Sequence, residues 1–259
     1  MRMPPPLRTV GYFARAYRRT WRASIVTTFV APVLYLTAMG VGLGSFVNKG
    51  GHTAALGGVS YLEFVAPALA ATTAATIAAS EATFPVMGAI KWTKTYFAML
   101  ATPLRVADVL AGHLTWIAIR AAMAVTAYLV VMAAFGTTKS PAAIGVLPVG
   151  VLVGLAFATP LAAFSATQEN DSSLSLVFRL GIIPLFLFSG VFFPISQLPA
   201  GLRVIAYVTP LWHGVDLCRQ LTLGQVNVAS CAFHVLYLTA LAGIGYRLAS
   251  RVYYARLRT

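Results

Sequence analysis

The sequence is poor in charged residues, and poorest in acidic ones. Only 10% of its 259 residues are charged and only six are acidic, against about 25% charged residues in ordinary soluble domains. Uncharged intervals cover 23–48, 64–80, 121–138, 140–168, 180–202 and 220–246. A helix of about 20 apolar residues crosses the hydrocarbon core of a bilayer. The pattern therefore predicts an all-α membrane protein.

Other absences narrow the function. Cys218 and Cys231 are the two cysteines, too few for a disulfide framework and without the spacing of metal ligands. No G-x-x-x-x-G-K-[ST] loop occurs, so the chain is not expected to bind ATP by that route. No His-Glu-x-x-His motif occurs either, and no catalytic constellation can be argued from spacing. We expect no enzyme activity, no metal and no cofactor in this chain.

The distribution of the basic residues gives a topology. We predict six spans, at 24–46, 61–80, 110–135, 142–166, 177–194 and 227–249. With a cytoplasmic N-terminus, fourteen Lys and Arg residues fall on inside segments and four on outside segments. Because positive residues are retained inside, both termini are predicted to be cytoplasmic in a plasma (inner) membrane protein. The net charge of +13 lies at the ends of spans and not along a groove, which argues against nucleic acid.

The first segment, 1–23, is predicted to be an amphipathic helix in the membrane interface, and 24–259 a six-helix transmembrane domain. Apolar and aromatic residues share one helical face: Leu7, Val10, Ala14, Tyr17 and Trp21. Arginines share the opposite face: Arg8, Arg15, Arg19 and Arg22. Such a helix lies on the lipid surface. It either only anchors the topology or also contacts a cytoplasmic partner.

Three further segments stand out. The second span is built mostly of Ala and Thr, including Thr72 and Thr76, and is predicted to be central because small side chains let helices approach closely. The connection 81–108 is long, aromatic and basic, which favours a short docked or interfacial helix. The stretch 194–219 is apolar but divided by Pro199 and Pro210, which favours a re-entrant helical hairpin.

That last region carries a family resemblance. The motif comprises Ile183-Pro184, an apolar run, Ser189-Gly190-Val191-Phe192-Phe193-Pro194, Leu198-Pro199 and Pro210-Leu211, with Asp216 and Arg219 nearby. The sequence resembles ABC type-2 exporter permeases over essentially its whole length. Tyr61-Leu62-Glu63-Phe64-Val65-Ala66-Pro67 is similar to the nodulation-factor and daunorubicin-resistance branch.

The resemblance implies partners. Two such membrane domains, identical or similar, would pair and sit on two ATP-hydrolysing subunits, which would hold ATP and Mg²⁺. The contacts with the ATPase would come from two loops, through Glu81, Pro85, Lys91, Trp92 and Lys94 in the first and Gln168, Glu169 and Asp171 in the second. Glu81 could instead cap the following segment.

The resemblance also implies a gate and a path. The outer mouth would be closed by a hairpin with Gly190, Phe193, Pro194, Leu198, Pro199, Pro210, Asp216 and Arg219, the last two pairing locally. The path would lie between two permease chains, near the second and fifth spans, with Thr72, Thr76 and Arg120 as candidates. Arg120 lies within a span, so it either meets an anionic substrate group or pairs with a neighbouring helix.

The function predicted is a permease that exports an amphipathic substrate from the cytoplasm or inner leaflet: a glycolipid, a lipo-oligosaccharide or a hydrophobic drug, as in multidrug efflux. The alternative is an ion-coupled secondary transporter. Such folds often have internal repeats and acidic residues at the membrane midplane. Neither is evident here, since most acidic residues lie near span ends or in loops.

Overall fold

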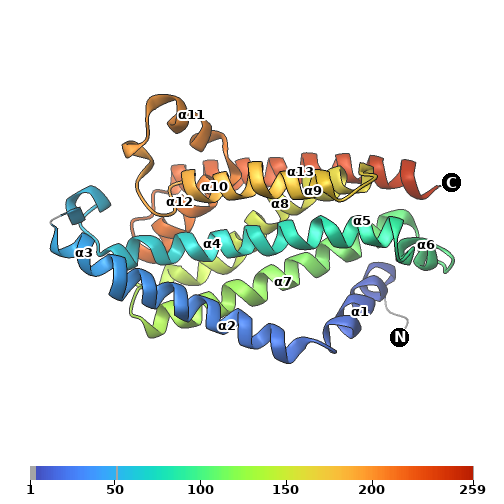
Figure 1. The fold of residues 1–259 in the computed structure, drawn as a ribbon, viewed down its shortest axis with the longest axis horizontal. Coiled ribbons are helices and arrows are strands. Elements are labelled where there is room, and N and C mark those ends of the chain that lie inside the picture. Colours follow the sequence, from blue (N-terminus) through green and yellow to red (C-terminus); the bar gives the residue numbers. More distant parts are fainter. Residues whose placement is uncertain (1–3, 51, 259) are drawn as a thin grey trace.

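The computed structural model describes residues 4–50 and 52–258, and every regular element in those two ranges is a helix. The long helices lie side by side, with α3 (Gly44–Lys49) at one end of the bundle and both termini at the other (Figure 1). We call these the α3 end and the terminus end. The prediction of an all-α membrane protein agrees with this architecture.

The elements follow one another without long gaps. The first half forms α1 (Pro5–Tyr17), α2 (Trp21–Thr37), η1 (Ala38–Leu43), α3, η2 (His52–Leu56), α4 (Tyr61–Ala82), α5 (Phe84–Lys91) and α6 (Thr95–Leu100). The second half forms α7 (Val106–Ala134), η3 (Pro141–Gly145), α8 (Val146–Thr167), α9 (Ser172–Leu176), η4 (Val177–Ile182), α10 (Ile183–Phe188), η5 (Ile195–Gln197), α11 (Ala200–Val208), α12 (Pro210–Leu223) and α13 (Val228–Leu257).

Five helical segments of the described chain are long and apolar enough to cross a membrane: Trp21–Lys49, Thr53–Lys91, Val106–Ala134, Pro141–Thr167 and Val228–Leu257. They cover five of the six predicted spans to within one residue. At the place of the sixth, 177–194, a shorter apolar helix runs over Ser172–Phe188. It ends early because the backbone leaves the helix after Phe188, and Gly190 adopts a left-handed φ of 75°. A count of six spans therefore stays a prediction.

Local capping sets two helix starts near the α3 end. Ser60 and Glu63 form a capping box at the start of α4, in which each side chain accepts a hydrogen bond from the other residue's backbone N–H. The hydroxyl of Thr209 caps α12 by accepting from the N–H of Trp212, and Pro210 occupies the first turn. Both boundaries follow from residues within a few positions of the helix start.

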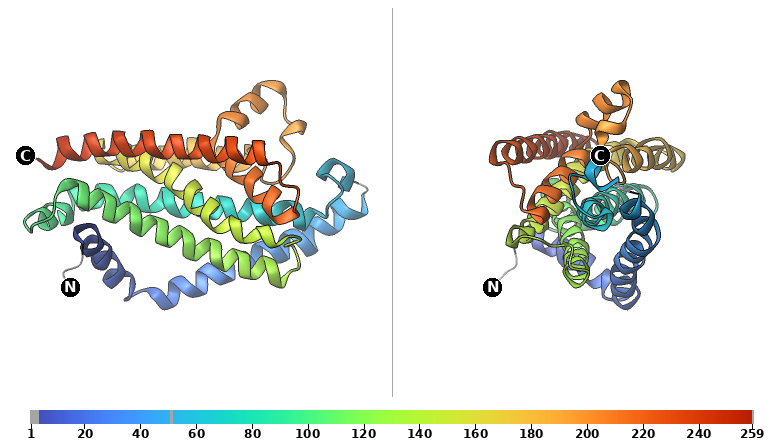
Figure 2. Two further views of the ribbon diagram at one scale, coloured as in Figure 1. Left: turned by 180° about the vertical axis from the view of Figure 1, so that it is seen from behind. Right: turned by 90° about the vertical axis from the view of Figure 1, so that its left-hand side faces the viewer.

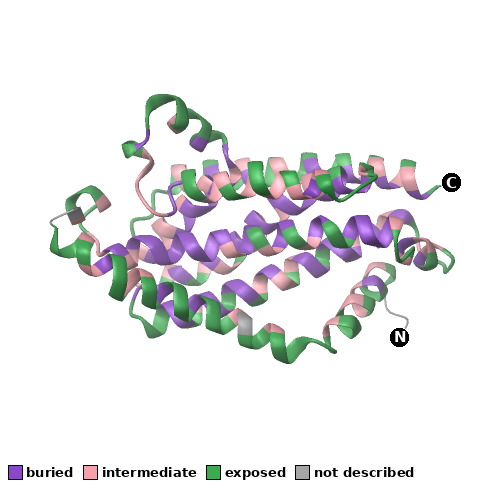
Figure 3. Ribbon diagram, in the orientation of Figure 1, coloured by how far each residue is buried: buried purple, intermediate pink, exposed green. Residues whose placement is uncertain are grey.

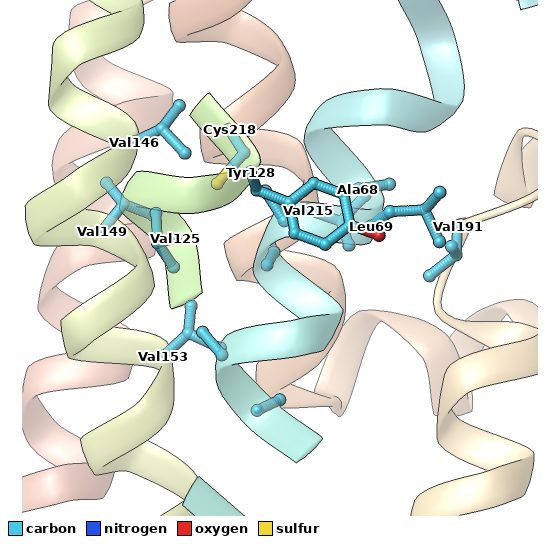
Figure 4. Close-up of a cluster of buried hydrophobic side chains, with 14 of the residues drawn as sticks. Ala68, Leu69, Val125, Tyr128, Val146, Val149, Val153, Val191, Val215 and Cys218 are labelled. Carbon is cyan, nitrogen blue, oxygen red and sulfur yellow. The ribbon is translucent and has the colours of Figure 1, made fainter. Parts of the chain in front are cut away.

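The second span, α4, is the centre of the bundle, as its Ala and Thr content predicts. It packs against α7, α8 and α12 (Figure 2). Most of its length is buried, whereas α2 and α13 are largely exposed (Figure 3). In the apolar core, Val125 of α7, Val153 of α8 and Val215 of α12 belong to one buried cluster with Ala68 and Leu69 of α4 (Figure 4). Exposed apolar residues on α2 and α13 suit contact with lipid.

The apolar stretch 194–219 is divided at Pro210, as expected, but its two helices differ in setting. The short helix α11 projects from the side of the bundle, whereas α12 packs against α4, α8 and α13 (Figures 1 and 2). Val204, Ile205 and Val208 of α11 are exposed. Whether this pair is re-entrant in a bilayer stays a prediction.

The N-terminal helix is shorter than the predicted range 1–23. The helix α1 ends at Tyr17, and Trp21 already begins α2. Residues 1–3 lie outside the described ranges. The face of α1 that is buried in the protein also differs from the apolar face predicted from the sequence. Thr9 is buried, while Leu7 of the apolar face is 46% exposed.

The reason for this difference is that α1 packs along α7 in addition to any contact with lipid. Gly112 of α7 leaves room for Thr9, since a Cβ there would overlap with the Thr9 side chain. The ring of Phe13 stacks on His113 with centroids 4.5 Å apart. One face of α1 therefore packs against α7 and not against lipid.

Candidate functional site

An apolar cavity of about 320 Å³ lies between α2, α4, α7 and the helix formed by η4 and α10. Its wall on α4 includes Thr72 and Thr76, the two threonines predicted to line a path. The remaining lining residues are Tyr35, Leu69, Thr73, Ile77, Tyr128, Phe178, Ile182, Ile183 and Phe186. The volume falls at the lower end of the range typical of small-molecule sites.

The hydroxyls of the predicted threonines add little polarity to this wall. Thr72 Oγ1 donates to the carbonyl of Ala68 at 2.8 Å, and Thr76 Oγ1 donates to the carbonyl of Thr72 at 2.8 Å. Each hydroxyl hydrogen therefore already has a partner inside its own helix, and the cavity is offered no donor from these two groups. The cavity suits a hydrocarbon chain or another apolar group.

One face of α4 stays open beside the cavity. Thr76 and Ser80, one helical turn apart, are exposed, although Ala75, Ala78 and Ala79 between and beside them are buried. Thr76 lines the cavity together with Tyr35 of α2 and Phe186 of α10. The helix that is otherwise the most buried thus presents a small-residue face to the outside.

Arg120 is absent from the lining of this cavity. Its Nε donates to Glu81 Oε1 at 3.2 Å, and its guanidinium carbon lies 4.5 Å from the centre of the Tyr17 ring. Both charged side chains are largely shielded, at 19% and 24% exposure. Of the two roles left open by the sequence, the structure supports pairing with a neighbouring helix.

This contact brings together three residues that the sequence assigned to different roles: Glu81 to ATPase coupling, Arg120 to the path and Tyr17 to the interface helix. Their helices are α4, α7 and α1. A carboxylate and an aromatic face together stabilise a partly buried cation. The result is one polar junction that joins the start of the chain to the end of the second span.

Two predicted coupling residues also pair with each other at the terminus end. The carboxylate of Glu169, in the loop after α8, accepts from Lys91 Nζ at the end of α5 and from Arg256 Nη2 near the end of α13. The hydrogen bond from Lys91, and then that from Arg256, lowers the pKa of Glu169 below its ordinary value. The two loops and the last helix are thereby tied together.

The connection 81–108 contains two short helices, α5 and α6, where a short helix was expected, and its docking on a partner stays a prediction. Pro85 lies in the first turn of α5 and is exposed. Trp92 is 62% exposed, and exposed Lys94 adopts a left-handed φ of 52° where α6 begins. The corner between α5 and α6 therefore presents an aromatic ring and a cation away from the bundle.

The second predicted coupling loop also contains Gln168 and Asp171, the remaining two candidates for contact with the ATPase. Gln168 Nε2 donates to the carbonyl of Phe164 at 3.3 Å, and Asp171 precedes the first residue of α9. The loop lies beside the end of α5, since Glu169 bonds to Lys91. The structure thus places the two predicted coupling loops side by side.

The interface helix keeps part of its predicted pattern. Arg15 and Arg19 are exposed, together with Tyr12, around a shallow hollow on α1. Trp21 is 44% exposed at the start of α2. Exposed Arg15 and Arg19 suit contact with lipid phosphates, while the Tyr17 ring packs against Arg120 and Trp116.

A second hollow, of about 290 Å³, lies at the α3 end. Predicted gate residues Phe193 and Pro194 line it, and so do Val47, Ala55, Leu56, Tyr61, Phe192 and Gln197. Leu198 is buried, and Pro199 directly precedes α11. The segment between α10 and α11 therefore forms a wall of this hollow.

Asp216 and Arg219 do not pair with each other as predicted. Asp216 Oδ2 accepts from His234 Nε2 at 3.1 Å and from Gln220 Nε2 at 2.6 Å. Arg219 instead donates to the carbonyls of Phe64 and Gly190, at 2.9 and 2.6 Å. The reason is that α12 lies between α13 on one side and α4 on the other, and each side chain finds a partner on its own side.

Sequence reasoning did not predict the polar cluster around His234. His213 Nδ1 and His234 Nδ1 lie 2.7 Å apart, joining α12 to α13, and Ser230 Oγ lies 3.1 Å from His234 Nε2. His213 and His234 are 21 residues apart, which no helical spacing predicts. Over the ranges that the structure describes, no group of three or more His, Cys, Asp or Glu side chains is arranged to hold a metal ion.

Comparison with known proteins points to one family. The model of the ABC-2 type transporter family matches residues 10–223. Nodulation protein J of Rhizobium leguminosarum bv. trifolii is 35% identical over 83% of this chain and 80% of its own length. Nodulation protein J of R. leguminosarum bv. viciae is 34% identical, over 85% and 82%. That of Rhizobium meliloti (strain 1021) is 30% identical, over 93% and 90%.

Proposed function

The chain belongs to the ABC-2 type transporter family and is a multi-pass transmembrane subunit of an ABC transporter, and on that premise we propose that it is the permease of an ATP-driven exporter. Its substrate is amphipathic: a glycolipid, a lipo-oligosaccharide or a hydrophobic drug. The substrate leaves the cytoplasm or the inner leaflet through this subunit.

The apolar cavity beside α4 is the observation that carries the proposal. It is bounded by four helices, opens beside the small-residue face of α4, and gains no donor from the hydroxyls of Thr72 and Thr76. Such a wall favours the apolar part of an amphipathic molecule and leaves its polar part to another surface. We infer that the cavity holds an acyl chain or a comparable hydrophobic group.

The ATPase partner docks at the terminus end. The exposed Trp92 and Lys94 at the corner of α5 and α6 lie on the same side as the loop that carries Gln168 and Asp171. Two ATPase copies, which hold ATP and Mg²⁺, then push on the ends of α4 and α8. In this arrangement the terminus end is cytoplasmic and the α3 end faces outward.

A second permease chain, identical or similar, closes the open face of α4. Thr76 and Ser80 are exposed on a helix whose other faces are buried, and small residues allow two helices to approach closely in a membrane. The cavity then becomes part of a path shared by two chains. In this proposal the Ser172–Phe188 helix completes six spans, and α11 with α12 forms the re-entrant outer hairpin.

Ion-coupled transport is disfavoured by the placement of the acids. None of the described residues that line the 320 Å³ cavity is acidic, and Glu63, Glu81, Glu169 and Asp216 each have a cationic or histidine partner elsewhere. A coupling site needs an acid that meets the ion or proton on the path.

The test of the partnership is purification of the tagged full chain from its native membrane. We expect an ABC ATPase subunit to co-purify, and Trp92→Ala with Lys94→Ala to reduce its recovery. A Tyr207→Ala chain, altered on the projecting α11, is the control and should recover the ATPase fully. Recovery of no ATPase, together with transport driven by an ion gradient, would contradict the proposal.

A further inference from the structure

Arg219 lies between two of the hollows described above. We call the 320 Å³ cavity beside α4 the membrane cavity, and the 290 Å³ hollow at the α3 end the outer hollow. It contacts Phe64 of α4 and the backbone of Gly190 and Val191. Along α4, Phe64 falls between Tyr61, which lines the outer hollow, and Leu69, which lines the membrane cavity. Arg219 therefore holds the bundle at the level that separates the two.

The segment 186–192 of the same chain places the two hollows in the same order along its length. Phe186 of α10 lines the membrane cavity and Phe192 lines the outer hollow. Gly190 and Val191, whose carbonyls Arg219 binds, lie between them in the sequence. Two separate segments, α4 and 186–192, thus place the Arg219 guanidinium between the membrane cavity and the outer hollow. We call this level the constriction.

The bonding explains why an arginine is needed there. The helix α10 ends at Phe188, so the carbonyls of Gly190 and Val191 have left the helical ladder. Non-helical backbone at membrane depth must be satisfied by protein groups. Arg219 Nη2 donates to Gly190 O at 2.6 Å and to Val191 O at 3.3 Å.

The other edge of the guanidinium binds α4. Its Nε donates to Phe64 O at 2.9 Å, and its carbon lies 3.6 Å from the centre of the Phe64 ring. A planar fork with several donors can bridge two backbone segments at once, whereas an ammonium is a single point charge. Arg219 thereby ties the segment after α10 to the central helix.

We propose that Arg219 is a latch: its guanidinium holds residues 189–194 against α4 and keeps the membrane cavity closed from the outer hollow until the exporter opens. The inference rests on the proposed function and deepens it by naming the group that holds the outer gate. Arg219 is a positioning residue here. It contacts backbone and one ring rather than substrate.

The test measures access through the constriction without ATP or substrate. Thr76→Cys places a thiol on the cavity wall, and a membrane-impermeant thiol reagent is added to the α3-end side of membranes that contain the full chain and its ATPase. The chain without Thr76→Cys gives the background from Cys218 and Cys231. Neither native cysteine lines the membrane cavity.

We expect Arg219→Gln to raise the labelling rate of the new thiol by about tenfold, because a charged hydrogen-bond donor to two segments is lost. Arg219→Lys should give an intermediate rate, since it keeps the charge and loses the fork. Arg203→Gln is the matched control. Arg203 also donates to two carbonyls, of Ser196 and Leu198, but only within the hairpin, so its rate should not change.

Equal rates in Arg219→Gln and the parent would overturn the latch, and so would a rise confined to reagent added at the terminus end. If Arg219→Gln does not reach the membrane, the Arg219→Lys chain decides by the same comparison. Because the assay omits ATP, a negative result leaves ATP-driven export standing. Failure of ATP-driven export would equally leave the labelling result in place.

Discussion

At the level of single residues, Arg120 and Arg219 inside the bundle are held by partners that lie far away in the sequence. Arg120 bonds to Glu81, 39 residues earlier, and Arg219 bonds to Phe64, 155 residues earlier. Helical periodicity can place Arg120 inside a span but cannot name its partner. For Asp216 and Arg219, spacing suggests a pair that the packing of α12 between two helices does not form.

Glu169 provides a prediction that depends on pH. Because its pKa is lowered in the fold, its ionised carboxylate stabilises the fold above its ordinary pKa of 4.5, and this contribution is lost as the pH falls through the lower folded value. The midpoint temperature of unfolding of Glu169→Gln should lie below that of the parent at pH 7, by no more than about 2 °C because the site is exposed.

The difference between Glu169→Gln and the parent should shrink as the pH falls below 4.5 and vanish once the pH is below the lowered pKa of Glu169 in the fold. Asp171→Asn is the matched control, with the same change of charge in the same loop and no ion pair among the residues that the structure describes. Its midpoint temperature should stay close to that of the parent at pH 7, because no ion pair is lost. A difference for Glu169→Gln that persists at low pH would contradict the assignment of its two bonds.

The pair of Glu81 and Arg120 gives a second residue-level prediction. Removal of one partner leaves a partly buried charge behind, so Glu81→Gln and Arg120→Gln should each destabilise the chain by about 2 kcal/mol. The double variant should be less destabilised than the sum, by about 1 kcal/mol. Thermal unfolding in detergent measures this cycle, and strict additivity would show that the two groups do not interact.

At the level of helices, sequence reasoning succeeds where the cause is local. Ser60 with Glu63, and Thr209 with Pro210, set helix starts through their own side chains. Long uncharged runs identify five long helices. The end of the Ser172–Phe188 helix depends instead on carbonyls that Arg219 satisfies, and the docked face of α1 depends on a glycine in α7. Neither cause is visible within the helix concerned.

The docking of α1 can be tested at Gly112. A Cβ at this position would overlap with Thr9 and lie 2.6 Å from the carbonyl oxygen of Pro6. Gly112→Ala should therefore displace α1 and destabilise the chain by about 1–3 kcal/mol, with faster proteolysis of the N-terminal segment. Gly243→Ala is the matched control in α13, where nothing lies within 4 Å of a new Cβ.

Gly243→Ala should be neutral or slightly stabilising, because Ala is a better helix former than Gly. Similar proteolysis of the two variants would show that α1 does not depend on its contact with Gly112. Protection of α1 in Gly112→Ala would lead to the same conclusion.

At the level of the whole molecule, the uncharged runs and their basic flanks predict the class of protein, and the Ala and Thr content of α4 predicts its central place. The candidate site is less accessible to sequence reasoning. Thr72 and Thr76 do lie on a cavity wall, but their neighbours there come from four separate helices. Arg219 was expected at the gate, yet its position between two cavities follows only from the fold.

The central claim is that this subunit is a passive path in the membrane that a separate ATPase drives. The most direct measurement reconstitutes the chain with its ATPase in vesicles and follows a fluorescent lipid-like amphiphile. We predict movement across the bilayer that requires both subunits and ATP and is unaffected by collapse of the proton gradient. Transport by the chain alone, or transport that continues without ATP and stops with the gradient, would contradict the account.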